Sequence, residues 1–465
     1  MKALHFAIIN NDLDMVQKLL KIQNIDVNFI FHGLSPLHFA IFQNNLEIVK
    51  ELLNHSKIEI NKRDNLFFST PLSKAASKGN LEIVKLLLEK DNSSINYLDK
   101  WYRSPLHYAS RNGYLEIVKL LLNNDSDVNA KDKDFRESEY YKGVDKHVNN
   151  KSEEKIKNKI IYYYGNTPLH FAISYNQQII VKELLNNPNS KNKIDVNIKN
   201  EYDYTPLHVA TKEGNLEIVK ELLNHPEIDL NIQDNDGNTP LHLFFEDEQN
   251  LQDLENENIW QYIKNQIINK VNNFNLYKKD IFKLLIENGA DVNIQDNKGI
   301  SSILHKAIFN ENLEIVKELL NHPEIDLNIQ DNDGNTPLHF ALFKNNLEIV
   351  QELIKHKNID YQKTNKKGEK PINLFCCSKC KNEDIKNILE LKSKIQITEK
   401  LLEDKSKLIQ KQILDLNNKL NFYKKEFENK LISSTIFSKQ ENETTNEPLS
   451  SLQEKISSLK IRHIP

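Results

Sequence analysis

Thr336-Pro337-Leu338-His339-Phe340-Ala341 is the clearest copy of a short motif that occurs ten times in this chain, mostly at intervals of about 34 residues. The other copies are Thr205-Pro206-Leu207-His208, Thr167-Pro168-Leu169-His170, Ser35-Pro36-Leu37-His38, Thr70-Pro71-Leu72-Ser73, Ser104-Pro105-Leu106-His107, Thr239-Pro240-Leu241-His242, Ser302-Ile303-Leu304-His305, the truncated Ala3-Leu4-His5-Phe6-Ala7 and the divergent Lys370-Pro371-Ile372-Asn373. A fixed period of this length predicts a stack of small units, none of which can bury its apolar face alone. The functional question is therefore what the surface of this stack holds.

The leucine of the motif shows where the period is kept and where it is interrupted. Leu4, Leu37, Leu72 and Leu106 follow one another at intervals of 33, 35 and 34 residues. The intervals from Leu106 to Leu169 and from Leu241 to Leu304 are 63 residues each, which predicts insertions at about 134–163 and 246–277. Residues 215–242 and 312–339 are identical over 28 positions, which indicates an internal duplication.

The motif at this period resembles the ankyrin repeat signature. The second half of each unit is similar to that family as well, as in Asn45-Leu46-Glu47-Ile48-Val49-Lys50-Glu51-Leu52-Leu53. The resemblance covers roughly residues 1–375 and implies an all-α, ankyrin-repeat solenoid of about ten helix-turn-helix units with β-turn fingers. It also implies that the motif histidine is structural and forms hydrogen bonds between neighbouring turns.

Local sequence explains why such a unit forms. Thr or Ser stands where an N-cap belongs, and Pro follows at the first helical position, where its missing N–H costs nothing. Gly or Asn stands four residues after the motif alanine in the uninterrupted copies, except at Glu311, and both types tolerate the left-handed conformation that ends a helix. Leu46, Ile48, Val49 and Leu52 then form an apolar stripe at helical spacing.

Three groups of residues raise the question of metal binding, and we predict neither a metal nor a cofactor. Eight of the 15 histidines belong to the motif and four more end the second helix of a unit. Residues 234–237 (Asp-Asn-Asp-Gly) fit a β-turn, because an EF-hand register would place Ile232 at a ligand position. Cys376, Cys377 and Cys380 have no second pair of cysteines, which a structural zinc site normally needs.

Composition narrows the class of protein. The formal net charge of −4 and the pI near 6.5 give no support for a nucleic-acid binder. No apolar run is long enough to span a membrane, and three clustered cysteines are typical of a reducing compartment. The first repeat begins within three residues of Met1, so we expect no secretory signal peptide. We expect a cytoplasmic location, or export into a host cell by a route without a cleavable signal peptide.

The two insertions and the C-terminal segment depart from the repeat pattern. The charged insertion at 134–163 is predicted to be a mobile loop or a recognition loop. The insertion at 246–277 carries apolar residues at helical spacing, which predicts an amphipathic helix that packs on the solenoid or binds a partner. Its apolar residues are Ile259, Trp260, Ile263, Ile267 and Val271.

Residues 383–432 are predicted to form a long amphipathic helix, and 433–465 a largely disordered tail. Leu391, Ile395, Leu402, Ile409, Leu416 and Tyr423 form one apolar series, and Ile413, Leu420 and Phe427 form a second. The seven-residue spacing is typical of a coiled coil and favours self-association. It is imperfect, because Thr398, Lys405 and Gln412 fall where apolar residues are expected.

In ankyrin stacks, the resemblance places binding residues at the fingertips and on the exposed side of the first helix. The early fingers carry Phe31, Phe67, Phe68, Trp101, Tyr102, Tyr163, Tyr164, Tyr202 and Tyr204. Variable positions of the first helix carry Phe42, Arg111, Tyr175, Lys212, Phe309 and Phe343. Phe68, Tyr102 and Asp203 replace the turn glycine found at 237 and 334, at some conformational cost. These aromatic residues either dock a protein partner or pack on neighbouring fingers and the first insertion.

The prediction that follows is a non-enzymatic scaffold that binds a protein partner through its concave face and fingers. An enzyme with ankyrin repeats as a targeting arm would need a catalytic domain, and we find no phosphate loop, nucleophile elbow or paired metal motif. A coiled-coil oligomer with the repeats as a spacer, and a secreted effector of an intracellular bacterium acting on host proteins, are the alternatives.

Overall fold

The computed structural model describes residues 2–133, 164–187, 193–245, 277–296, 302–374 and 383–440. Four predicted features lie outside these residues. They are the first insertion with Tyr163, the second insertion except for residue 277, the three cysteines and residues 441–465 of the predicted tail. The chain divides into two compact units, residues 1–382 and 383–465.

The first unit is a repeated pair of antiparallel helices, as predicted. The first helices of the pairs are α1 (Lys2–Ile9), α3 (Pro36–Phe42), α5 (Pro71–Lys78), α7 (Pro105–Asn112), α10 (Pro168–Ser174), α12 (Pro206–Lys212), η3 (His242–Phe245), α16 (Ile303–Phe309), α18 (Pro337–Phe343) and α20 (Pro371–Leu374). The second helices are α2 (Leu13–Leu20), α4 (Leu46–Leu53), α6 (Leu81–Lys90), α8 (Leu115–Asn123), α11 (Gln178–Asn186), α13 (Leu216–Leu223), residues 277–287, α17 (Leu313–Leu320) and α19 (Leu347–Leu353).

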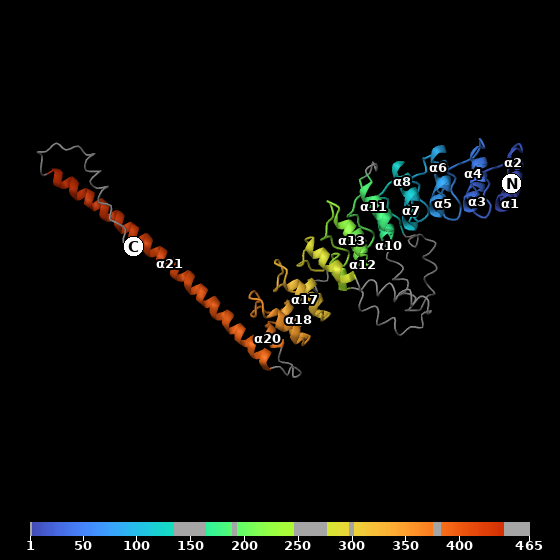
Figure 1. Cartoon of the computed structure of the whole chain (residues 1–465). Coiled ribbons are helices and arrows are strands. Elements are labelled where there is room, and N and C mark those ends of the chain that lie inside the picture. Colours follow the sequence, from blue (N-terminus) through green and yellow to red (C-terminus); the bar gives the residue numbers. More distant parts are fainter. Residues whose placement is uncertain are drawn as a thin grey trace. The chain divides into compact units, whose positions relative to one another are not determined.

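These helices form two layers. First helices pack on first helices, as in the series α3, α5, α7, and second helices pack on second helices, as in α4, α6, α8 (Figure 1). The core between the layers repeats in every unit: Leu37, Ala40 and Ile41 of α3 and Ile48 and Val49 of α4 are all almost fully buried. Because each unit exposes an apolar side until its neighbour covers it, the stack is stabilised mainly by burial at the contacts between repeats.

The predicted helix signals act as expected. Thr205 caps α12, where its hydroxyl accepts the His208 N–H at 3.4 Å, and Pro206 occupies the first helical turn. Left-handed residues end the first helices, with φ of 55° at Asn44 and 77° at Gly79. Glu311, the exception in sequence, adopts φ of 54° as well. The position therefore requires this conformation whichever residue occupies it, and Glu311 takes it at a conformational cost.

A ladder of motif histidines joins the repeats. The His107 Nδ1 accepts the Ser104 N–H at 3.0 Å, so the ring proton is on Nε2, which donates to the Asn166 carbonyl of the next finger at 3.1 Å. His38, His170, His208, His305 and His339 also bond their own cap residue through Nδ1 and a carbonyl of the next finger through Nε2. The structural role implied by the family resemblance is confirmed for these residues.

A second ladder, of asparagines, was not anticipated from the sequence. The Asn28 side chain donates to the Lys57 carbonyl at 2.7 Å and accepts the Glu59 N–H at 2.9 Å, both in the next repeat. Asn96, Asn129, Asn197, Asn293 and Asn328 make the same pair of bonds. The signal in the sequence was an asparagine that recurs in the segment leading into each finger.

Glutamines near the later fingers use main-chain carbonyls in the same way. The Gln233 amide donates to Gly237 of its own finger at 2.7 Å and to the Gln295 carbonyl of the next repeat at 2.9 Å. Its duplicate Gln330 donates to Gly334 at 2.6 Å and to the Thr364 carbonyl at 3.0 Å. Polar contacts between repeats therefore end largely on backbone atoms.

The helices beside the first insertion keep the regular packing of the stack, whereas the motif helix beside the second insertion differs from the other motif helices. Across the first insertion α7 still packs on α10 and α8 on α11. Before the second insertion, the described part of the motif helix is the 3₁₀ turn η3, whose four residues are buried. The second helix of that repeat resumes at 277–287, where Ile281, Phe282 and Leu285 are buried.

The second unit contains one long helix, α21 (Glu383–Gln440). The sequence predicts an end near residue 432, whereas the helix continues for eight more residues, since no Gly or Pro interrupts it. Six apolar residues between 409 and 427, each more than half exposed, alternate at spacings of four and three. They are Ile409, Ile413, Leu416, Leu420, Tyr423 and Phe427. In the described residues, no helix is long and apolar enough to cross a membrane.

Candidate binding surface

The fingers are held by a buried acidic or amide residue at their base. Asp99 Oδ1 accepts the backbone N–H groups of Trp101 at 2.9 Å and Arg103 at 3.0 Å, and Tyr108 Oη donates to Oδ2. Asn200 holds Tyr202 and Tyr204 in the same way. Burial raises the pKa of Asp99, and the hydrogen bonds to its carboxylate oppose that rise. These contacts fix the backbone that carries the aromatic side chains.

Three of the early fingers adopt left-handed backbone at their tips without glycine, whereas Gly33 and Gly165 occupy the equivalent position in two others. Phe68, Tyr102 and Asp203 have φ of 54°, 60° and 59°, where the later fingers have Gly237 at 77° and Gly334 at 79°. Such a conformation costs a non-glycine residue of order 1 kcal/mol. The predicted conformational cost at these three positions is therefore confirmed.

The predicted aromatic residues of the fingers form small clusters. Phe67 and Trp101 of neighbouring fingers stack with ring centroids 5.1 Å apart. The Lys100 amine lies 4.3 Å from the centroid of Phe67 and 4.5 Å from that of Trp101. Phe68 is 53% exposed and Tyr102 is 46% exposed. Stacking on a neighbouring finger and exposure at the tip therefore occur together on the same edge.

The first and last early fingers differ from this pair. Phe31 packs against Phe6 at 5.8 Å and against His5 at 5.4 Å, so it extends the edge to the first repeat. Tyr202 and Tyr164 are half-buried. Tyr204 is buried, and its ring stacks on His208 at 5.7 Å while its hydroxyl accepts a hydrogen bond from Lys212. Tyr204 therefore supports the finger and offers little surface to a partner.

On the first helices, exposed aromatic residues are paired with cations. Lys78 lies 4.5 Å from the Phe42 ring centroid, and the Arg111 guanidinium lies 4.6 Å from that of Tyr175. We define the inner face as the fingers together with this exposed side of the first helices. Phe42, Arg111 and Tyr175 all belong to first helices or their caps, so they lie on this inner face together with the aromatic residues of the fingers. Cation–π pairs at exposed sites such as these contribute about 0.5–1 kcal/mol each.

Sequence reasoning missed the cations that accompany these rings. Lys74, Lys78 and Lys133 each lie within 6 Å of an aromatic centroid, at Phe42 for the first two and at Tyr102 for the third. Each cation comes from the finger or first helix that neighbours its ring. Of these three, only Lys133 has a lysine at the equivalent position of the preceding finger, at Lys100.

A buried ion pair lies under the fourth finger. Arg103 Nε donates to Asp132 Oδ2 at 3.1 Å, and the Asp132 side chain is fully buried. Burial raises the pKa of Asp132 to about 6, although the Arg103 charge opposes that rise. Removing one partner of such a pair leaves a buried charge, so both residues belong to the frame of the finger.

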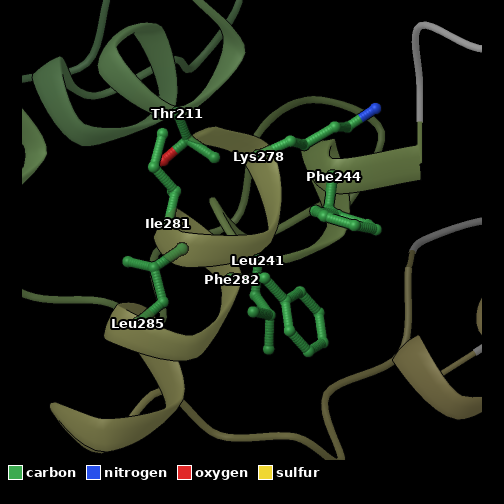
Figure 2. Close-up of a pocket in the computed structure, with 7 residues that line it drawn as sticks. All are labelled: Thr211, Leu241, Phe244, Lys278, Ile281, Phe282 and Leu285. Atoms are coloured by element: carbon green, nitrogen blue, oxygen red, sulfur yellow. The ribbon is translucent and has the colours of Figure 1, made fainter. Parts of the chain in front are cut away.

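The described residues form a small cavity and a larger, more open hollow of about 300 Å³ beside Leu223, Ile228 and Asn288. The best-formed cavity, of about 10 Å³, is bounded by Thr211, Leu241, Phe244, Lys278, Ile281, Phe282 and Leu285 (Figure 2). It has room for roughly one water molecule. In Figure 2 the Lys278 amine points away from this cavity. Among these residues no cluster of His, Cys, Asp or Glu is arranged to hold a metal ion.

Comparison with known proteins agrees with this architecture. A family model described as ankyrin repeats matches residues 1–64, 56–132, 138–234, 190–251 and 270–365. The crystal structure of the human ASB11 ankyrin repeat domain is similar over 52% of this chain and 90% of that one, with 24% identity and a TM-score of 0.39. No curated protein matches the chain. Since the family model covers well over half of the sequence, this chain belongs to the ankyrin repeat family.

Proposed function

We propose that the chain is a non-enzymatic scaffold that holds a protein partner on the inner face of its early repeats. Ankyrin repeats are general protein–protein interaction modules. The observation that carries the proposal is the aromatic edge. Phe68 and Tyr102 accept a left-handed backbone at the tips of fingers where glycine would be favoured, and both rings remain about half exposed. Exposed aromatic residues on a rigid frame are typical of interface hot spots.

A pull-down with the full chain as bait tests this proposal. The test variant carries Phe68→Ser, Trp101→Ser and Tyr102→Ser. The control variant carries Ile179→Ser, Tyr277→Ser and Phe422→Ser, which remove large apolar groups outside the fingers. Loss of a partner from the test variant alone, with unchanged circular dichroism, is the expected result. A partner retained by the test variant and lost by the control would place binding elsewhere.

A second proposal is that α21 brings two copies of the chain together. Its supporting observation is the alternation of exposed apolar residues between Ile409 and Phe427 at the spacing of a coiled coil. A dimer would present two ankyrin stacks to one target and raise its avidity. Light scattering of the full chain, whose monomer mass is 54.3 kDa, measures whether it associates. The cytoplasmic location stays a prediction, to be checked by cell fractionation.

A further inference from the structure

The inner face of repeats two to five has a charge opposite to that of the whole chain. We define the early inner face as the fingers and first helices at 31–45, 64–80, 99–114, 130–133 and 164–178. It carries seven Lys and Arg residues and three Asp residues, in a chain whose formal net charge is −4. The cations are Lys74, Lys78, Lys100, Arg103, Arg111, Lys131 and Lys133. All three aspartates, Asp64, Asp99 and Asp132, are at most 5% exposed. A partner therefore meets cations and aromatic rings there, with no exposed carboxylate among the described residues.

The buried aspartates are occupied within the fingers. Asp64 accepts the N–H groups of Leu66 and Phe67 at 3.0 and 2.6 Å, and Asp99 accepts those of Trp101 and Arg103. Asp132 accepts from the Asn166 N–H at 2.7 Å and from Arg103. Of the seven cations, Arg103 is the one that forms an ion pair with these aspartates. These aspartates hold the frame of the fingers, while Lys100 and Lys131 donate to the Leu66 and Lys199 carbonyls.

Six of the seven cations face rings, Lys100 and Arg103 at Trp101 among them, and the other four face rings that are about half exposed. Lys74 and Lys78 lie 5.6 and 4.5 Å from the Phe42 centroid, Arg111 4.6 Å from that of Tyr175 and Lys133 4.8 Å from that of Tyr102. Burial, and next to it the charge of Lys78, lower the pKa of Lys74. The two ammonium groups over one ring therefore repel each other. A carboxylate placed between them would relieve that repulsion.

We propose that the early inner face binds an extended acidic peptide segment of a partner protein, with carboxylates at about every third residue. The inference rests on the proposed scaffold function and names the chemistry of its partner. The spacing follows from general geometry. First helices in direct contact lie roughly 8–10 Å apart. A polyproline II segment rises about 3.1 Å per residue with three residues per turn, so every third side chain leaves the same side of the chain and about three residues span one repeat. Each carboxylate then meets the cations of one repeat.

Single-stranded nucleic acid is the other polyanion that binds aromatic and basic surfaces. It needs open ring faces on which successive bases stack. Here Phe67 and Trp101 stack on each other with the Lys100 amine close to both, and the Phe42, Tyr102 and Tyr175 rings each have a cation over them. Because these ring faces are already covered by another ring or by a cation, they offer no open face on which a base can stack. A peptide with carboxylates needs only the cations, so it is the favoured ligand.

Fluorescence anisotropy of the full chain with defined probes tests the proposal. The first probe is a fluorescein-labelled peptide of four Glu-Ser-Gly triplets. The second has the same composition with its four glutamates contiguous, and the third is a five-nucleotide oligothymidine with four phosphates. The inner-face variant carries Lys74→Gln, Lys78→Gln, Arg111→Gln and Lys133→Gln. The matched control carries Lys50→Gln, Lys85→Gln, Lys119→Gln and Lys220→Gln on second helices, where each lysine forms an exposed ion pair.

We expect the triplet peptide to bind more tightly than the other two probes, and more weakly as salt is raised from 20 to 150 mM. Its Kd should rise at least tenfold in the inner-face variant and less than twofold in the control. No binding at 20 mM salt, equal losses in both variants, equal Kd for the two peptides, or tighter binding of the oligothymidine would each overturn the proposal. The aromatic variant used in the pull-down keeps these four cations. If a partner is lost from the aromatic variant but retained by the inner-face variant, the scaffold function stands and only the proposal of an acidic ligand is refuted.

Discussion

At the scale of single residues, the motif histidines are the group most sensitive to conditions. Their bonds to the cap residue and to the next finger require the neutral ring, with its proton on Nε2. Burial lowers the pKa of His107 and His242 to about 3, and that of His170, His208 and His305 to about 4. The unfolded chain takes up protons near pH 6.5, well before these folded sites do.

Acid should therefore destabilise the stack. A group whose folded pKa is lowered contributes stability that is complete above its unfolded pKa and is lost as pH falls from about 6.5 toward 4. Each of these histidines should lower the free energy of unfolding by about 2 kcal/mol between pH 7 and pH 5. Asp99, Asp132 and Asp234, whose folded pKa values are raised by burial, act in the opposite direction and offset part of this loss. Urea unfolding at the two pH values measures the sum.

His170→Gln isolates one contribution. The variant should be less stable at pH 7 by about 1–3 kcal/mol, since a buried hydrogen bond to the Tyr204 carbonyl is lost. The difference in free energy of unfolding between wild-type protein and variant should be smaller at pH 5. The reason is that protonation of His170 in the unfolded state destabilises the wild-type protein but not the variant. A gap that stays constant between the two pH values would show that His170 does not titrate in this window.

Residue identity alone could not separate the aromatic residues that support a finger from those that a partner can reach. Tyr202 and Tyr204 are two residues apart in the sequence, yet Tyr202 is half-buried while Tyr204 is buried against His208. The difference depends on which side of the finger each side chain leaves, and the turn geometry decides that. The cations over Phe42 and Tyr102 come from neighbouring repeats, so no local pattern around the rings revealed them.

At the scale of helices, more of the structure could be predicted from the sequence than at the scale of single side chains. Helix starts and ends could be predicted because caps, proline and left-handed positions act within a few residues. At η3, beside the second insertion, the local signal of Thr239 and Pro240 did not start an α-helix at Pro240, as the equivalent residues do at α12 and α18. The end of α21 was missed because serine-rich sequence is compatible with a helix that no Gly or Pro stops.

The proposed pairing of α21 makes a prediction at this scale. Leu416→Lys with Leu420→Lys places charges in the apolar seam and should convert a dimer into a monomer. The control Leu414→Lys with Phe422→Lys makes the same change at residues that are equally exposed but lie off the seam. Light scattering over a range of concentrations gives the mass of each. The same mass for both variants would argue against a seam made by Ile409 to Phe427.

At the scale of the whole molecule, the first insertion leaves the stack at one point of a finger and returns beside it. Asp132 Oδ1 accepts the Asn166 N–H at 2.7 Å across the insertion, as Asp234 accepts that of Asn238 at 2.8 Å in an uninterrupted finger. The Gly165 N–H donates to the Asp132 carbonyl as well, at 3.0 Å. The period in the sequence located this insertion, and the structure adds that the finger is complete without it.

Deleting residues 134–163 should therefore leave a folded protein. Joining Lys133 to Tyr164 creates a finger of regular length, and closing a shorter loop should raise stability by up to about 2 kcal/mol. The control replaces the same residues with a Gly-Ser linker of equal length. Urea unfolding compares the three chains. A deletion less stable than the linker control would show that the insertion itself contributes contacts to the stack.

The use of main-chain carbonyls between repeats bears on how such a chain changes over generations. Gln233 and Gln330 belong to identical segments with different neighbours, Gln295 in one case and Thr364 in the other, and both donate to the carbonyl of that neighbour. A carbonyl is present whatever the residue type. A duplicated repeat can thus form the same hydrogen bonds beside a neighbour of different sequence. The gene can therefore gain or lose whole repeats while the residues at the tips of the fingers diverge.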